Sequence, residues 1–162
     1  MDLRKIYDYA LQREREGRDF FATNAKKVSH AAAVGIFEKL AAEEEKHIAF
    51  IQKLIDALGS PAQQEATAAE MAKASFFTQR ADSEALDQTI IESMIPDVTV
   101  LRMAYLIERD FAEFYEMAAG KAEGEAKETL TMLAQWERGH EKLFKGIHDR
   151  VYQEYMEIPW GG

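Results

Sequence analysis

The sequence predicts an all-α protein, a bundle of four long helices with a long crossover between the second and the third. Three observations support this prediction. Apolar residues recur at helical spacing over four long stretches. Only 3 prolines and 9 glycines are available to interrupt helices among 162 residues. Short turns follow the first and third stretches, whereas the middle connection is long. A single domain over residues 1–162 is expected for a chain of this length.

The first helix pair is predicted over residues 2–58. Its first helix covers residues 2–28, with Asp2 as a plausible N-cap and its apolar residues on one side. A two-residue break follows, and the second helix then runs to about Leu58. There the segment Gly59-Ser60-Pro61 is a clear signal for the end of a helix.

The second helix pair is predicted over residues 97–155. Its first helix runs from Asp97 to Ala119, where a glycine-containing turn begins, and its second helix runs from about Glu125 to Tyr155. The crossover over residues 59–96 is rich in Gln, Ala, Thr and Ser, with a shorter helix predicted near its end, from about Ala85 to Met94. Covering the bundle interior and contacting a second chain are both open roles for the crossover.

The composition excludes several classes of function. The chain has no cysteine, which excludes disulfides, cysteine-ligated metals and thiol catalysis. Its 29 acidic and 20 basic residues give a net charge of −9, whereas binders of nucleic acid or anionic membranes are usually basic. The N-terminus has no apolar signal-peptide region, and no segment approaches the roughly 18 apolar residues of a membrane span. We therefore expect a cytoplasmic protein without nucleic-acid or membrane partners.

The two helix pairs contain the same pattern of charged residues. Each pair has a single Glu on its first helix and a Glu-x-x-His motif on its second helix, 30 (44 − 14) or 29 (137 − 108) residues later. The corresponding residues are Glu14 and Glu108, Glu44 and Glu137, and His47 and His140. The offset between the halves is 94 (108 − 14) for the single Glu and 93 (137 − 44) for the motif. A matched repeat of this kind is much harder to attribute to chance than one isolated motif.

These six residues have the chemistry of a site for two metal ions. Residues i and i+3 share a helix face, so the Glu and His of each motif can bind one ion. Glu14 and Glu108 lie on the apolar stripes of their helices, where an uncompensated carboxylate would be very unfavourable. Four carboxylates carry a charge of −4, which two divalent cations balance, and neutral imidazoles complete the ligand set. Mixed oxygen and nitrogen ligands suit iron or manganese.

Several alternatives remain open for individual residues. Buried Glu–His or Glu–Arg networks form without metal, and four arginines lie nearby in the sequence. These arginines are Arg13, Arg18, Arg109 and Arg138.

Tyr105, one turn before Glu108, is a candidate hydrogen-bond donor or redox-active phenol, with a core tyrosine as the alternative. Gly17, three residues after Glu14, either leaves room for a small oxidant or only allows close packing. His30 and His148 lack a Glu three residues earlier and are expected to be surface or packing residues.

At these residues the sequence resembles the rubrerythrin-like branch of the ferritin-like superfamily, over nearly the whole chain except the crossover and the tail. The matching segments are Ala10-x3-Glu14-x5-Phe20-Phe21, Leu40-Ala-Ala-Glu-Glu44-Glu-Lys-His47, Ala104-x3-Glu108-x5-Phe114-Tyr115 and Leu133-Ala134-x2-Glu137-x2-His140. The resemblance implies a ferritin-like four-helix bundle, whose established ligand set for two iron or two manganese ions is the one found here. It also implies that these six residues hold a carboxylate-bridged di-iron centre.

The sequence departs from rubrerythrin itself in two respects. Rubrerythrins carry a rubredoxin domain with four cysteines, which this chain lacks, and an additional glutamate ligand, which has no counterpart beside Glu108. The resemblance implies an oxidoreductase of oxidative stress that reduces peroxide or dioxygen with electrons from an external donor, such as a rubredoxin-like protein. A homodimer or higher homo-oligomer is expected. Iron binding or storage without turnover, and a helical interaction module without metal, are the alternatives.

Overall fold

The computed structural model describes residues 2–29, 31–60 and 94–159. Within these ranges the chain forms helices and no strands, which confirms the predicted all-α fold. The helices are α1 (Leu3–Asn24), α2 (Ala31–Asp56), α5 (Val98–Ala119) and α6 (Gly124–Glu157), with a short 3-10 helix η1 (Ile95–Asp97) directly before α5. The sequence predicts a short helix from Ala85 to Met94. Of these residues the structure describes only Met94, which lies in a turn.

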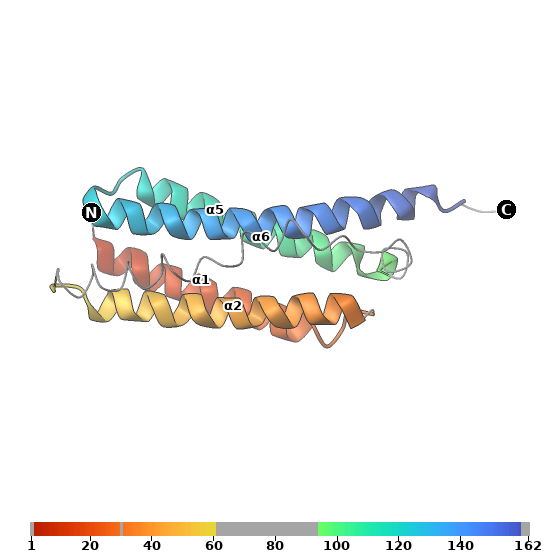
Figure 1. Ribbon diagram of the computed structural model, residues 1–162, viewed down its shortest axis with the longest axis horizontal. Helices are drawn as coiled ribbons and strands as arrows, with labels where there is room; N and C mark the ends of the chain where they lie inside the picture. Colours follow the sequence, from red (N-terminus) through yellow and green to blue (C-terminus); the bar gives the residue numbers. More distant parts are fainter. Residues whose placement is uncertain (1, 30, 61–93, 160–162) are drawn as a thin grey trace.

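The four helices form two layers of two (Figure 1). Helices α1 and α2 run in opposite directions in one layer, and α5 and α6 run in opposite directions in the other. The end of α2 and the beginning of α5 lie at opposite ends of the bundle. The chain between them, like His30 and residues 160–162, falls outside the described part of the chain.

Local contacts explain where the helices begin and end. The Asp2 side chain accepts a hydrogen bond from the backbone N–H of Lys5 at 3.3 Å, as expected for the N-cap of α1. Helix α1 ends at Asn24, earlier than predicted, where the Asn24 amide donates to the backbone oxygen of Phe20 at 2.8 Å. Asparagine side chains that bond to nearby backbone groups favour helix ends over helix interiors. Gly59 has a φ of +97°, which fits the predicted stop after α2.

A buried aspartate connects the two helix pairs. Both the backbone N–H and the hydroxyl of Ser29 donate to the carboxylate of Asp97, at 3.0 Å and 2.9 Å. Ser29 lies in the turn between α1 and α2, and Asp97 is the last residue of η1. This contact fixes the turn of the first pair against the start of α5.

The apolar core is divided into two clusters along the bundle. The first apolar cluster includes Tyr7, Ala10, Leu11, Ile51 and Leu54. The second apolar cluster includes Phe21, Phe37, Leu40, Leu101 and Phe144. Between the two clusters lie the polar residues Glu14 on α1 and Glu44 and His47 on α2, all fully or nearly fully buried. The middle of the bundle is therefore polar, although water is excluded on both sides of it.

Helices α1 and α5 approach closely where Gly17 faces Phe111. A Cβ atom on Gly17 would lie 2.9 Å from Cε2 of Phe111 and 3.8 Å from the carboxyl carbon of Glu44. The space beside Gly17 is thus filled by the Phe111 ring, which supports packing rather than room for a small oxidant. A glycine at this position leaves room for the Phe111 ring.

Replacing Gly17 with alanine is expected to destabilise the protein, whereas Gly146→Ala is expected to stabilise it. Alanine gains about 1 kcal/mol of helix propensity at either position. At Gly17 the overpacking against Phe111 opposes this gain by about 1–3 kcal/mol. At Gly146 in α6 no atom lies within 4 Å of the added Cβ. Urea unfolding of both variants measures the difference, and equal stabilisation of the two would contradict the packing shown here.

Candidate metal centre

The six residues of the repeated motif come together in the middle of the bundle. Helix α1 supplies Glu14 and α5 supplies Glu108, while α2 and α6 each supply one Glu-x-x-His motif. All four glutamates are 0% exposed, and His47 and His140 are 3% and 6% exposed. Every helix of the bundle therefore contributes at least one side chain to a buried cluster of carboxylates and imidazoles.

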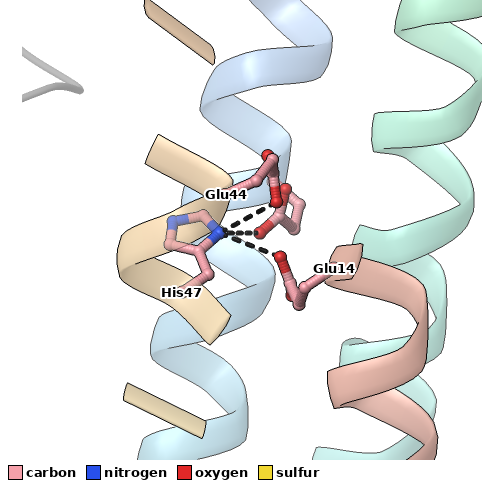
Figure 2. A group of neighbouring side chains, drawn as sticks. Glu14, Glu44 and His47 are labelled. Atoms are coloured by element: carbon pink, nitrogen blue, oxygen red, sulfur yellow. Dashed lines mark hydrogen bonds and ion pairs between the residues drawn. The ribbon is translucent and has the colours of Figure 1, made fainter. Parts of the chain in front are cut away.

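The first group in this cluster surrounds His47. Its Nδ1 atom lies 3.1 Å from Oε2 of Glu14, 3.4 Å from Oε2 of Glu44 and 3.1 Å from Oε1 of Glu137. Figure 2 shows the Glu14 and Glu44 carboxylates converging on the His47 ring. One ligand atom from each of these four residues lies within 4.8 Å of all the others, which is close enough to hold one metal ion.

The second group surrounds His140 in the same manner. Its Nδ1 atom lies 3.7 Å from Oε1 of Glu44, 3.4 Å from Oε2 of Glu108 and 3.4 Å from Oε2 of Glu137. These four residues also place one ligand atom each within 4.8 Å of the others. Glu44 and Glu137 belong to both groups, and each turns one oxygen toward His47 and its other oxygen toward His140. This is the arrangement of two carboxylates that can bridge two ions.

Hydrogen bonding within the cluster is incomplete. Both carboxylate oxygens of Glu44, Glu108 and Glu137 are buried, and none receives a hydrogen bond from the described residues. Buried polar atoms are nearly always hydrogen-bonded in folded proteins, so six exceptions in one cluster need a compensating partner. Cations are the partners that a set of carboxylate oxygens and imidazole nitrogens fits best.

The nearby arginines do not supply this compensation. Each of the four makes an ion pair with an exposed glutamate. The pairs are Arg13–Glu16 at 3.1 Å, Arg18–Glu45 at 3.0 Å, Arg109–Glu113 at 3.9 Å and Arg138–Glu116 at 2.8 Å. The Glu–Arg network that the sequence left open is therefore not formed in the described part of the bundle. The Glu–His contacts remain, together with the six carboxylate oxygens that lack donors.

Comparison with known proteins agrees with this geometry. A family model described as Rubrerythrin matches residues 5–148, which is most of the chain. The chain belongs to the rubrerythrin family. Neither the curated proteins nor the solved structures include a significant match to it. For this rubrerythrin-family chain, the buried carboxylate and histidine groups are thus a place where metal could be held.

The protonation of the cluster also reflects its need for cations. Burial raises the pKa of Glu44 well above its usual value, and the Glu14 and Glu137 charges raise it further. Burial, with the charges of Glu44 and Glu137, does the same for Glu108. Burial opposes the charged form of His47, but the carboxylates of Glu137, Glu44 and Glu14 outweigh it and raise its pKa well above normal. Without metal, protons therefore take the place of cations in the cluster.

Glu137 and His140 form a complementary pair in the same cluster. Burial would raise the pKa of Glu137, but the charge of His47 and the close approach of both imidazoles lower it below its usual value. Burial would lower the pKa of His140, but Glu137 and Glu44 raise it. Without metal, these opposite shifts favour an ionised Glu137 beside imidazoles that take up protons more readily than usual.

Tyr115 contacts the cluster and was missed by the sequence analysis. It is 1% exposed, and its hydroxyl donates a hydrogen bond to Oε1 of Glu14. Burial and the Glu14 charge raise the pKa of the Tyr115 hydroxyl, which keeps its proton available for this bond. The available signal was its position in the repeat, where Tyr115 corresponds to Phe21 and thus adds a hydroxyl to an apolar stripe.

Trp136 contacts a residue of the cluster, whereas the ring contact of Tyr105 is with His148. The Tyr105 ring packs against His148, with 5.2 Å between ring centroids, and a redox role for its phenol remains a prediction. The Trp136 indole lies over the His47 ring, with 4.9 Å between centroids and an angle of 19° between planes. The sequence did not indicate this contact between Trp136 and His47.

A search of the described helices for membrane spans found none that combines the necessary length and hydropathy. This agrees with the charged residues distributed along the outer faces of α1 and α6.

Metal binding to the rubrerythrin-family chain is expected to release protons and to tighten as the pH rises. Glu44, Glu108, His47 and His140 have raised pKa values without metal, whereas a bound ion requires ionised carboxylates and neutral imidazoles. At a pH below the raised pKa values, the apparent affinity should rise about tenfold per pH unit for each proton that binding releases. Calorimetric titration with Mn²⁺ in buffers of different ionisation enthalpy counts these protons. Affinity independent of pH, or proton uptake, would contradict the assignment.

Proposed function

We propose that this chain binds two iron ions at the buried cluster and reduces peroxide or dioxygen with electrons from an external donor. The observation that supports this most directly is the pair of overlapping ligand groups that share Glu44 and Glu137. Two divalent ions would balance the four carboxylates electrically. Manganese, which accepts the same oxygen and nitrogen ligands, is the alternative metal.

The proposed ligands fall into the two groups already described. One position would be held by Glu14, Glu44, Glu137 and His47, and the other by Glu44, Glu108, Glu137 and His140. When bound, the two irons would supply the electrons that reduce the oxidant. The four carboxylates would stabilise the additional positive charge of the oxidised metals.

The surrounding residues have distinct tasks in this proposal. The two apolar clusters exclude water on either side of the centre, so that charges inside it interact strongly. Tyr115 holds its proton on the hydroxyl and orients Glu14 by donating to Oε1. Reduction of hydrogen peroxide to two waters consumes two electrons and two protons. No residue among the 162 is a cysteine, so a rubredoxin-type iron site cannot form from them, and we assign the electron supply to a separate donor.

Rapid mixing of the reduced, iron-loaded protein with hydrogen peroxide tests the proposal. A ferric absorption band should appear, and a parallel reaction with dioxygen identifies the preferred oxidant. The Glu44→Ala variant removes a shared ligand and is the control for iron bound elsewhere. If the reduced protein is fully loaded but neither oxidant produces ferric iron, the proposed reaction is wrong.

The proposed assembly is a homodimer or a higher homo-oligomer. Size-exclusion chromatography with light scattering determines the mass of the iron-loaded protein. A small oligomer is expected for the proposed oxidoreductase, whereas a large hollow assembly that takes up many irons per chain would favour storage instead.

A further inference from the structure

Two contacts make the two halves of the candidate metal centre unequal. The hydroxyl of Tyr115 donates to Glu14, whereas the corresponding residue of the first half, Phe21 (115 − 94 = 21), has no hydroxyl. The indole of Trp136 lies over His47, whereas its counterpart in the first half is Glu43 (136 − 93 = 43). Glu43 forms an ion pair with Lys46 on the same helix.

Both contacts act on the same ligand group. Glu14 is fixed through both of its oxygens, because Tyr115 donates to Oε1 and Nδ1 of His47 lies 3.1 Å from Oε2. The matching glutamate of the other half, Glu108, is equally buried, yet neither of its oxygens receives a hydrogen bond within the described ranges. The Glu14 carboxylate is therefore oriented without metal, and the Glu108 carboxylate is not oriented in this way.

The ring of His47 also stacks with two other rings. The Trp136 indole lies nearly parallel to it, and so does the His140 ring, with 5.6 Å between centroids and an angle of 15° between planes. Trp136 is in turn held against Phe50 of α2, with 6.4 Å between ring centroids. Stacking of this kind fixes the plane of the imidazole and thus the direction of its nitrogen atoms.

We propose that the two metal positions fill in order, and that the position formed by Glu14, Glu44, Glu137 and His47 binds first. The inference rests on the metal-binding part of the proposed function. A ligand that is already oriented loses less freedom when the ion binds. Groups that hold a metal ligand in place typically contribute roughly 10- to 100-fold to affinity. Tyr115 and Trp136 are positioning residues for the first ion, and the second ion completes the centre through Glu108 and His140.

Titration of the metal-free protein with Mn²⁺, followed by calorimetry and by electron paramagnetic resonance, tests this order. We expect two phases of one ion per chain each, with affinities that differ roughly 10- to 100-fold. The first equivalent should give the spectrum of isolated Mn²⁺, and the second should convert it to that of a coupled pair. His47→Ala should remove the tight phase, and His140→Ala should remove the weak phase.

A pair of single-atom variants tests the role of the hydroxyl. Tyr115→Phe makes the second half like the first and should weaken the tight phase about tenfold. Phe21→Tyr adds a hydroxyl at the corresponding position and should strengthen the weak phase, because Glu108 has buried oxygens that could accept it. Both variants keep the ring in place, and circular dichroism before titration verifies their fold.

Substitution of Trp136 tests the stacking separately. Trp136→Phe keeps an aromatic ring over His47 and should preserve most of the tight binding, whereas Trp136→Leu should weaken the tight phase and leave the weak phase unchanged. A merely structural role would affect both phases alike. Equal affinities in the unmodified protein, or a tight phase that depends on His140 and not on His47, would overturn the inference.

The outcomes also separate this inference from the proposed function. Two ordered phases without any reaction of the iron-loaded protein with peroxide or dioxygen would support the order of binding and contradict the oxidoreductase. Oxidation by a centre that fills both positions with equal affinity would support the oxidoreductase and overturn the order. Absence of any Mn²⁺ or iron binding would overturn both.

Discussion

Replacing Glu108 with methionine is expected to stabilise the metal-free protein and to remove the second metal position. Glu108 is completely buried, and its two oxygens have no hydrogen-bond donor in the described structure. Removing a buried polar group without a partner typically restores about 1–3 kcal/mol of folding free energy. The same change deletes a ligand that only the second group uses. Functional sites are often built at a cost in stability, so we expect the variant to gain folding stability without metal and to lose metal binding.

The stabilisation by Glu108→Met should increase as the pH rises. Burial raises the pKa of Glu108 in the folded protein above the value in the unfolded chain, so folding takes up a proton between these two values. Rising pH therefore destabilises the unmodified folded protein, because Glu108 must ionise while buried. The variant lacks this group and so gains more stability at the higher pH. Urea unfolding of chelator-treated protein at pH 5 and pH 8 measures the effect. Glu113→Met on the exposed face of α5 is the matched control, with an expected change within about 0.5 kcal/mol.

A Glu108→Met variant that unfolds more easily than the unmodified metal-free protein would contradict this interpretation. It would mean that the Glu108 carboxyl group contributes a favourable interaction that the described contacts do not contain.

Loading with iron or manganese is expected to raise the melting temperature, and chelation is expected to lower it. Metal that binds only the folded state stabilises it by about 2.7 kcal/mol at a free concentration one hundred times the dissociation constant. For a chain of this size, 1 kcal/mol shifts the melting temperature by about 2–4 °C, which gives a rise of about 5–10 °C for the tighter ion. Differential scanning calorimetry of the same sample before and after loading measures it.

The Glu137→Ala variant is the control for the thermal experiment. Because Glu137 belongs to both ligand groups, its removal should weaken binding of both ions and so reduce the rise in melting temperature on loading. An unchanged melting temperature after verified loading, or the same rise in Glu137→Ala, would show that the ions bind outside the cluster.

The sequence was sufficient to predict which six side chains meet. Glu14 and Glu108 interrupt apolar stripes, so their burial followed from helical periodicity alone, and the repeat selected Glu44 and not its acidic neighbours. The i, i+3 spacing then placed His47 on the same helix face. These are properties of single helices, which periodicity describes well.

Contacts between helices could not be predicted in this way. A tyrosine and a phenylalanine fit an apolar stripe equally well, and the Tyr115 hydroxyl reaches Glu14 only because α1 and α5 approach closely where Phe111 covers Gly17. The spacing of Trp136 relates it to His140 on its own helix, whereas its ring stacks on His47 of α2. Such contacts depend on the relative positions of two helices, which one sequence does not specify.

The most direct test of the account is the metal content of protein purified without oxygen. The account predicts two iron ions per chain in the unmodified protein and a large loss in both Glu44→Ala and Glu137→Ala, which lack a shared ligand. Exposed Glu16 on α1 provides the control, and Glu16→Gln should retain both ions. Less than one ion per chain after loading with ferrous iron, or a content unchanged by loss of either shared glutamate, would contradict a di-iron centre at this site.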